Sequence, residues 1–161
     1  MEPECQASDA WRQALWQEIS LALAIGRDAE EVLTAISTGR NECPVIDECA
    51  RDAMKQISDA TSIGVLIWLP LAAHRVYETS LFWQTQAVMA NISEGAGLQA
   101  LLPILALHAS RVSFQWELIA QLAARSGLPD LLDLLTEAAE QRCRVSRTVE
   151  AACLVQWPEG E

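Results

Sequence analysis

The sequence predicts an all-α protein, an antiparallel bundle of about five helices with coiled-coil-like seams. Half of the 161 residues are hydrophobic (51%), and Ala and Leu, which are strong helix formers, outnumber the β-branched residues. Apolar residues recur at steps of three and four, the spacing of one stripe on a helix. Residues 61–125 carry only three acidic and three basic side chains. Helices this poor in charge must be covered by other helices, by a second subunit or by an apolar surface.

The first 60 residues predict acidic, amphipathic helices. We expect three of them, over residues 11–26, 28–39 and 45–60. Trp11, Leu15 and Ile19 form the apolar stripe of the first. Asp28 is the expected N-cap of the second, with Glu31 as its capping-box partner.

The remaining residues predict three further helical segments, over residues 62–95, 98–124 and 128–152. Pro70 should kink or restart the first of these, and Pro129 fits the first turn of the last. Residues 63–73 form an uninterrupted apolar run, but a bilayer span needs about 20 residues. We therefore expect one helical domain over residues 1–161, acidic in residues 1–60, and no membrane span.

The net charge of −11 is unevenly distributed. Residues 1–60 hold twelve acids and five bases, whereas residues 127–161 hold seven and three. With a single lysine, Lys55, this surface repels phosphate backbones and anionic lipid head groups, so we expect no nucleic-acid partner. The five cysteines are odd in number and the chain start is acidic and polar, which predicts reduced thiols in the cytoplasm.

The sequence contains no arrangement typical of an enzyme. A carboxylate-bridged metal bundle needs Glu three residues before His, but Leu71 and Leu105 precede His74 and His108. Glycine-rich phosphate loops and Gly-x-Ser-x-Gly are absent, and the cysteine spacings do not suit zinc. We therefore expect no catalytic residues, no metal and no cofactor.

Two polar residues fall on apolar seams. His108 lies between Leu105 and Val112, which favours a core histidine hydrogen-bonded to a neighbouring helix over a ligand or a switch. Arg142 could pair with an acid across the bundle, or could extend outward along its aliphatic stem. For Arg142 we favour the outward position.

Residues 68–155 resemble the phasins, helical proteins that coat polyhydroxyalkanoate granules in bacteria. A segment like residues 68–73 (WLPLAA) leads into a helix with Phe82-Trp83, and the next helix carries Leu101-Leu102 early and Phe114 later. The resemblance implies a non-enzymatic protein with amphipathic helices that coats such granules in the cytoplasm and forms a homo-oligomer.

The chain thus has two candidate functions. One is phasin-like association with a granule surface through residues 61–157. The alternative is a cytoplasmic helical adaptor or regulatory module that binds a partner protein through its uncharged central helices. A third, weaker hypothesis is a bundle that holds an apolar ligand or a metal around His108. The candidates for an apolar surface or a partner-binding site are Trp68, Leu69, Leu71, Phe82, Trp83, Leu101, Leu105 and Trp116.

Overall fold

The computed structural model describes residues 3–38, 44–66 and 94–156. These residues form the helices α1 (Pro3–Thr38), α2 (Pro44–Leu66), α4 (Glu94–Arg125) and α5 (Leu132–Gln156), with a short 3-10 helix, η1 (Pro129–Leu131), before α5. No strand occurs within these ranges, which confirms the all-α fold class. Most of the helix expected over residues 62–95 lies outside the described residues, so the number of about five helices stays a prediction.

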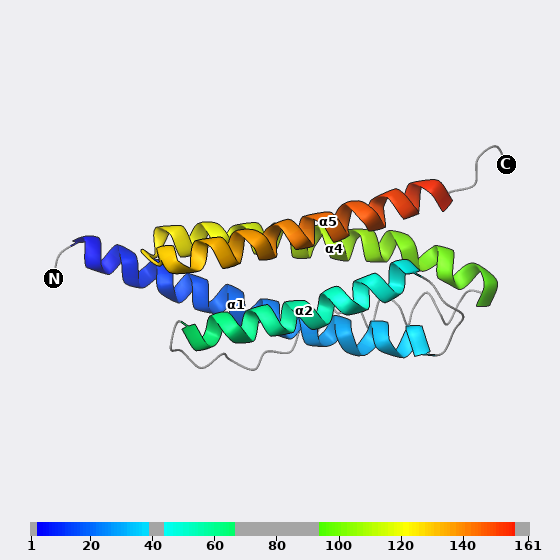
Figure 1. The fold of residues 1–161 in the computed structure, drawn as a ribbon, viewed down its shortest axis with the longest axis horizontal. Coiled ribbons are helices and arrows are strands. Elements are labelled where there is room, and N and C mark those ends of the chain that lie inside the picture. Colours follow the sequence, from blue (N-terminus) through cyan, green and yellow to red (C-terminus); the bar gives the residue numbers. More distant parts are fainter. Residues whose placement is uncertain (1–2, 39–43, 67–93, 157–161) are drawn as a thin grey trace.

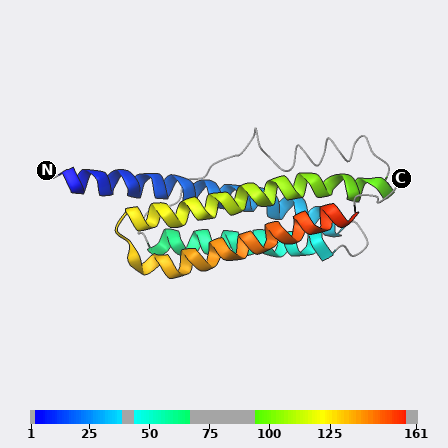
Figure 2. The same cartoon turned by 90° about the horizontal axis from the view of Figure 1, so that it is seen from above.

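The four long helices lie side by side around a common axis, and each runs antiparallel to its neighbours (Figure 1). Helix α1 packs most closely against α2, and α4 against α5, so the fold consists of two helical hairpins. Between the hairpins, α1 contacts α4 more extensively than α2 contacts α5. The first turns of α1 project past the end of the other three helices (Figure 2).

Helix α1 is continuous, so the expected break between residues 26 and 28 is wrong. Gly26 is buried in the middle of α1, and a Cβ built on it would lie 3.2 Å from Ile57 Cγ1 and 3.4 Å from Gln56 Cγ on α2. The glycine therefore allows α1 and α2 to approach closely, and it does not end the helix. Asp28, the expected N-cap, lies inside the helix as a consequence.

The turn between α4 and α5 follows the expected break at residues 126–127. Gly127 has φ +70°, and the N–H of Leu128 bonds the carbonyl of Ala123 at 3.3 Å. Together with the longer bond from Gly127 N–H to Ala124 O, this is a Schellman motif. The left-handed residue reverses the chain and sends α5 back along α4.

The other helix boundaries differ moderately from those expected. Helix α2 begins at Pro44 and continues to Leu66, past the expected end at residue 60. Helix α4 begins at Glu94, four residues early, and contains Pro103 within its length. Most of its expected apolar stripe faces inward, because Leu101, Leu105, Val112, Trp116 and Ile119 are all buried, whereas His108 is only partly buried.

The buried apolar residues form two clusters, one toward each end of the bundle. The first cluster takes Leu15–Ile25 of α1, the end of α2, residues 112–123 of α4 and the start of α5. The second takes Ala29–Leu33 of α1, the start of α2, Leu105 and Ala109 of α4, and Val145 and Val149 of α5. Between these clusters lie buried polar side chains, chiefly Gln56, Asp59 and Arg142. The core is therefore divided at mid-length by a polar layer.

Candidate functional site

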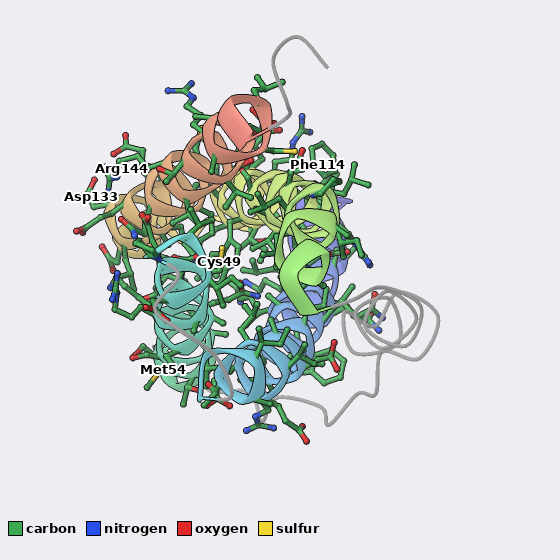
Figure 3. The ribbon with its side chains drawn as sticks, turned by 90° about the vertical axis from the view of Figure 1, so that its right-hand side faces the viewer. Cys49, Met54, Phe114, Asp133 and Arg144 are labelled. Carbon is green, nitrogen blue, oxygen red and sulfur yellow. The ribbon has the colours of Figure 1, made fainter. Side chains whose placement is uncertain are left out.

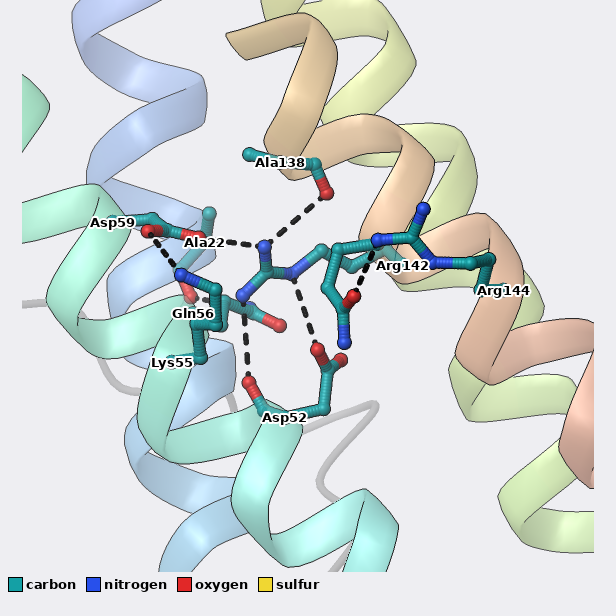
Figure 4. Close-up of polar contacts among 9 residues, drawn as sticks. Ala22, Asp52, Lys55, Gln56, Asp59, Ala138, Arg142 and Arg144 are labelled. Atoms are coloured by element: carbon teal, nitrogen blue, oxygen red, sulfur yellow. Dashed lines mark hydrogen bonds and ion pairs between the residues drawn. The ribbon is translucent and has the colours of Figure 1, made fainter. Parts of the chain in front are cut away.

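Arg142 forms the centre of this polar layer. Its side chain is only 1% exposed, and its Nη1 donates hydrogen bonds to Asp59 Oδ2 at 2.6 Å and to Ala138 O at 3.2 Å (Figure 4). Its Nη2 reaches the main-chain carbonyl of Asp52 at 3.4 Å. The guanidinium also lies 4.9 Å from the ring centre of Trp116, a cation–π distance. Arg142 thus joins α5 to α2 while its flat face rests on α4, and the preferred outward position is wrong.

Two carboxylates of α2 balance this buried cation. Asp59 pairs with two cations, because its Oδ2 bonds Arg142 and its Oδ1 lies 3.6 Å from Lys55 Nζ. Asp52 Oδ1 lies 3.7 Å from Arg142 Nε, a distance too long for a hydrogen bond. Burial raises the pKa of Asp52, although Arg142 and a hydrogen bond with Gln141 act to lower it. Keeping Asp52 ionised in the core therefore costs free energy that the ion pair only partly offsets.

A small cavity of about 20 Å³ adjoins the layer, enough space for about one water molecule. It is lined by all four helices, with Leu33 from α1, Gln56 from α2, His108 from α4 and Val145 from α5 among the lining residues. Asp52 and Arg142 also line it, and their atoms Asp52 Oδ1 and Arg142 Nε are buried without a hydrogen-bond partner. These two atoms lie 3.7 Å apart, which is too close for a water molecule to fit between them.

His108 lines the same cavity and is partly buried. Burial, and to a smaller extent the guanidinium of Arg111, lowers the pKa of His108 to about 4. The imidazole is therefore neutral at pH 7. Asp52, Gln56 and Arg142 line this cavity together with His108, but the cavity is far smaller than the pockets of several hundred Å³ that hold organic ligands.

Within the described residues no group of three or more His, Cys, Asp or Glu side chains could hold a metal ion. Cys49 is buried, borders the cavity and points toward the bundle axis (Figure 3). The geometry is that of a structural ion-pair network that joins α2 to α5.

The second candidate site is the outer face of α4, which we define as Leu107, Arg111, Phe114 and Glu117. Leu107 is 74% exposed and Phe114 68% exposed, and seven residues separate them, so they lie two turns apart on one stripe. Arg111 and Glu117 are exposed on the two flanks of Phe114. Figure 3 places Phe114 on the outside of the bundle, far from Met54 of α2.

The electrostatic setting of this face differs from that of the other helices. Helix α4 holds two acids and two bases, whereas α1 holds six acids and two bases, and α2 holds four and two. Helix α5 is also net negative, and it exposes Leu154, which is 77% accessible. Among the described helices α4 is thus the one without net charge, and it combines this with large exposed apolar side chains.

The structure corrects three of the sequence-predicted surface residues. Leu101 and Trp116 are 0% exposed and Leu105 is 1% exposed, so as surface candidates they are wrong. They occupy the inner stripe of α4, where helical spacing points them at α1 and α5. The other candidates lie outside the described residues: Trp68, Leu69, Leu71, Phe82 and Trp83.

The outer-face residues could have been found by the same periodicity. A stripe through Leu105, Val112 and Trp116 puts Leu107 and Phe114 on the opposite side of the helix, at 100° per residue. An apolar residue there is exposed unless another element covers it. No comparable signal links Arg142 to Asp59, because 83 residues separate them in the chain.

No protein-family model, no curated protein and no solved structure matches this chain. None of the described helices contains a stretch both long and apolar enough to cross a lipid bilayer.

Proposed function

We propose that this protein is a non-enzymatic, phasin-like protein that attaches to an apolar surface, specifically that of polyhydroxyalkanoate granules. The observation that carries the proposal is the outer face of α4, where Leu107 and Phe114 are exposed on the helix without net charge. The cytoplasmic, granule-associated location and the self-association expected from the sequence belong to the same proposal.

The division of charge supports this function. Apolar area removed from water contributes about 25 cal/mol per Å², so a few large side chains laid on a polyester would contribute several kcal/mol. The acidic helix α1 would then remain in water, where its negative charge keeps coated particles apart. One neutral, apolar side and one charged side are what a coat protein needs.

The alternative of a helical adaptor draws support from a different detail of the same face. Arg111 and Glu117 flank Phe114 with charges of opposite sign. A polyester surface carries no charges that could pair with these two side chains. A partner protein could match both charges, which would fix the orientation of the two proteins in the complex. In that case Phe114 would be the apolar anchor of a protein interface.

The test is partition of the purified protein onto polyhydroxybutyrate particles. Phe114→Glu and Leu107→Glu should each weaken retention, by about tenfold for a loss of 1.4 kcal/mol. Met54→Glu on α2 is the matched control, because Met54 is 57% exposed on another side of the bundle. The pair Trp68→Ala and Leu69→Ala tests the sequence-predicted segment outside the described residues.

The outcomes separate the two functions. The granule-coat function is supported if the wild-type protein is retained on the polyester, if Phe114→Glu abolishes this retention and if Met54→Glu does not change it. If the wild-type protein stays in solution, the granule proposal is wrong. Loss of a specific protein complex in Arg111→Glu, with polyester binding absent, would then favour the adaptor.

A further inference from the structure

Three residues on the outer face of α4, Arg111, Phe114 and Glu117, form a symmetric row. They are three positions apart, so they follow one of the ridges that cross a helix surface at about 45° to its axis. All three side chains are exposed, and Phe114 at the centre is 68% accessible. The cation precedes the aromatic ring by the same step at which the anion follows it. A half-turn about Phe114 therefore exchanges the positions of the positive and the negative side chain.

Such a row is complementary to a second copy of itself. In a two-fold symmetric pair, every contact between the two molecules occurs twice, with the roles of the residues exchanged. When two rows lie against each other in opposite directions, Phe114 faces Phe114 of the second copy, and Arg111 faces Glu117 of the second copy at both ends. Because each row is inclined to its helix by about 45°, the two α4 helices then cross at about 90°. Both charges and both rings thus find partners in one small contact.

The charge of the other helices favours α4 as the place where two copies meet. With a net charge of −11, two copies repel each other in most orientations. Helix α4 holds as many bases as acids, whereas α1, α2 and α5 each hold more acids than bases. Approach along α4 therefore brings the fewest like charges together among the described helices. A partner with a basic surface would be attracted to α1 instead, so the neutral face of α4 suits a second copy of this chain.

We propose that two copies of this chain pair in solution through the row of Arg111, Phe114 and Glu117, as a two-fold symmetric dimer with crossed α4 helices. Two crossed helices cover less than the roughly 800 Å² per partner of a standard interface, so the dimer is weak. Its consequence for regulation rests on the proposed function: the dimer covers Phe114, so a molecule must leave its second copy before this face attaches to a granule. Pairing thus keeps the apolar face out of water until a polyester surface competes for it.

Sedimentation velocity of the full-length protein over about a hundredfold range of concentration tests the pairing, because the dimer fraction rises with concentration. Arg111→Glu and Glu117→Arg each place like charges opposite each other at both ends of the row, and each should weaken dimerisation by about tenfold or more. Met54→Glu on α2 is the matched control, since Met54 is 57% exposed away from α4, and it should leave the dimer unchanged. The substituted side chains are all exposed, so the helical signal in circular dichroism should be retained.

A mixture of the two charge variants gives the sharpest test. Arg111→Glu has acids at both ends of its row and Glu117→Arg has bases at both ends, so each chain is complementary to the other but not to itself. The equimolar mixture should therefore dimerise at a concentration at which each variant alone is a monomer. The double variant Arg111→Glu with Glu117→Arg only exchanges the two charges, and it should dimerise like the wild type. Contact through another surface would give neither result.

The regulation is tested by adsorption to polyhydroxybutyrate particles. Where the wild type is mainly dimeric, only its monomer fraction can bind, which weakens its apparent affinity in proportion to that fraction. Arg111→Glu and Glu117→Arg should therefore both adsorb with higher apparent affinity than the wild type. They change the net charge in opposite directions, so a gain shared by both does not come from net charge. Phe114→Glu should reduce both dimerisation and adsorption.

Three results would overturn the pairing. The wild type could sediment as a monomer at every concentration, which would leave this face to the polyester or to another protein. The dimer could persist in both charge variants, which would place it on another surface, or the mixed variants could fail to associate. Adsorption of the charge variants no stronger than that of the dimeric wild type would overturn the regulation. If the dimer forms as described and no variant adsorbs, the granule function is wrong and the pairing stands.

Discussion

Arg142 is the residue at which most of the polar interactions of the core meet. It contacts α2 through Asp59 and the carbonyl of Asp52, and α4 through the ring of Trp116. Breaking a buried pair by removing one partner is costly, because the remaining charge stays buried without compensation. The pair as a whole contributes less than this cost suggests, since apolar side chains of similar volume often replace such pairs without loss.

We therefore predict that Arg142→Met lowers the free energy of unfolding by about 3–5 kcal/mol in urea denaturation. Arg144→Met is the matched control on the same helix, because the side chain of Arg144 is exposed and donates a hydrogen bond to Gln141 of its own helix. Its effect should stay within about 0.5 kcal/mol. Equal effects of the two substitutions would contradict a role for the ion pair in stability.

His108 makes the stability of the bundle depend on pH. Its pKa is about 4 in the folded protein and about 6.5 in the unfolded chain, so between these values the unfolded chain binds more protons. The free energy of unfolding should therefore fall as the pH decreases from 6.5 to 4, by about 1–3 kcal/mol for a partly buried group. His108→Gln should flatten this part of the curve measured by urea denaturation.

The charged groups around His108 modify this dependence in a predictable direction. Arg111 on α4 and Arg142 on α5 are cations, and Asp52 on α2 has a raised pKa. The folded protein protonates Asp52 at a higher pH than the unfolded chain does, which adds stability as the pH falls and opposes the effect of His108. In the Asp52→Asn variant the free energy of unfolding should therefore fall more steeply as the pH decreases. If it falls as in the wild type, Asp52 does not have a raised pKa in the folded protein.

At the scale of elements, two glycines have opposite roles. Gly26 lies inside α1 against Ile57 and Gln56, whereas Gly127 has φ +70° and open space where a Cβ would lie. Gly26→Leu should cost about 1–3 kcal/mol through overpacking between α1 and α2, although helix propensity alone would favour leucine. Gly127→Ala should cost about 1 kcal/mol through backbone conformation alone. Stabilisation by Gly26→Leu would show that the helices can separate freely at this point.

Gly26 also shows how far sequence reasoning reaches. Helical spacing correctly places the inner stripe of α4 and the turn at Gly127, because both depend on local geometry. A glycine two residues before an aspartate looks the same in sequence whether it ends a helix or allows a neighbouring helix to approach. Distinguishing the two requires knowing that Ile57 lies across from Gly26, which is a long-range contact.

The candidate sites also differ in whether they depend on local helix geometry or on long-range contacts. The inner stripe of α4 implies which residues lie on its outer face, so the exposure of Phe114 can be predicted from the sequence. The partners of Arg142 cannot be predicted in this way. Whether Arg142 points inward or outward depends on which acidic side chain the fold brings opposite it. Asp59 and Asp52 reach that position only because α2 packs against α5 in a fixed register.

At the scale of the whole molecule, charge and apolar surface are separated among the helices. Helix α1 holds six acids and two bases, whereas α4 is neutral and α2 buries two of its four acids, Asp52 and Asp59. Molecules that adsorb through α4 would therefore turn like charges toward one another as the surface fills. Repulsion between neighbours, more than the affinity of each molecule, should then limit how densely the protein covers a particle.

This limit predicts a specific effect of salt on adsorption. Raising the ionic strength from about 0.01 M to 0.15 M shortens the Debye length from about 30 Å to about 8 Å, so neighbouring molecules repel less. The amount bound at saturation on polyhydroxybutyrate should increase, as measured by depletion of protein from solution. Glu30→Gln with Glu31→Gln removes two negative charges from α1 and should reduce the salt dependence, while Phe114→Glu should bind weakly at both ionic strengths. Saturation that does not change with salt would mean that contacts between apolar side chains, and not charge, set the density of the coat.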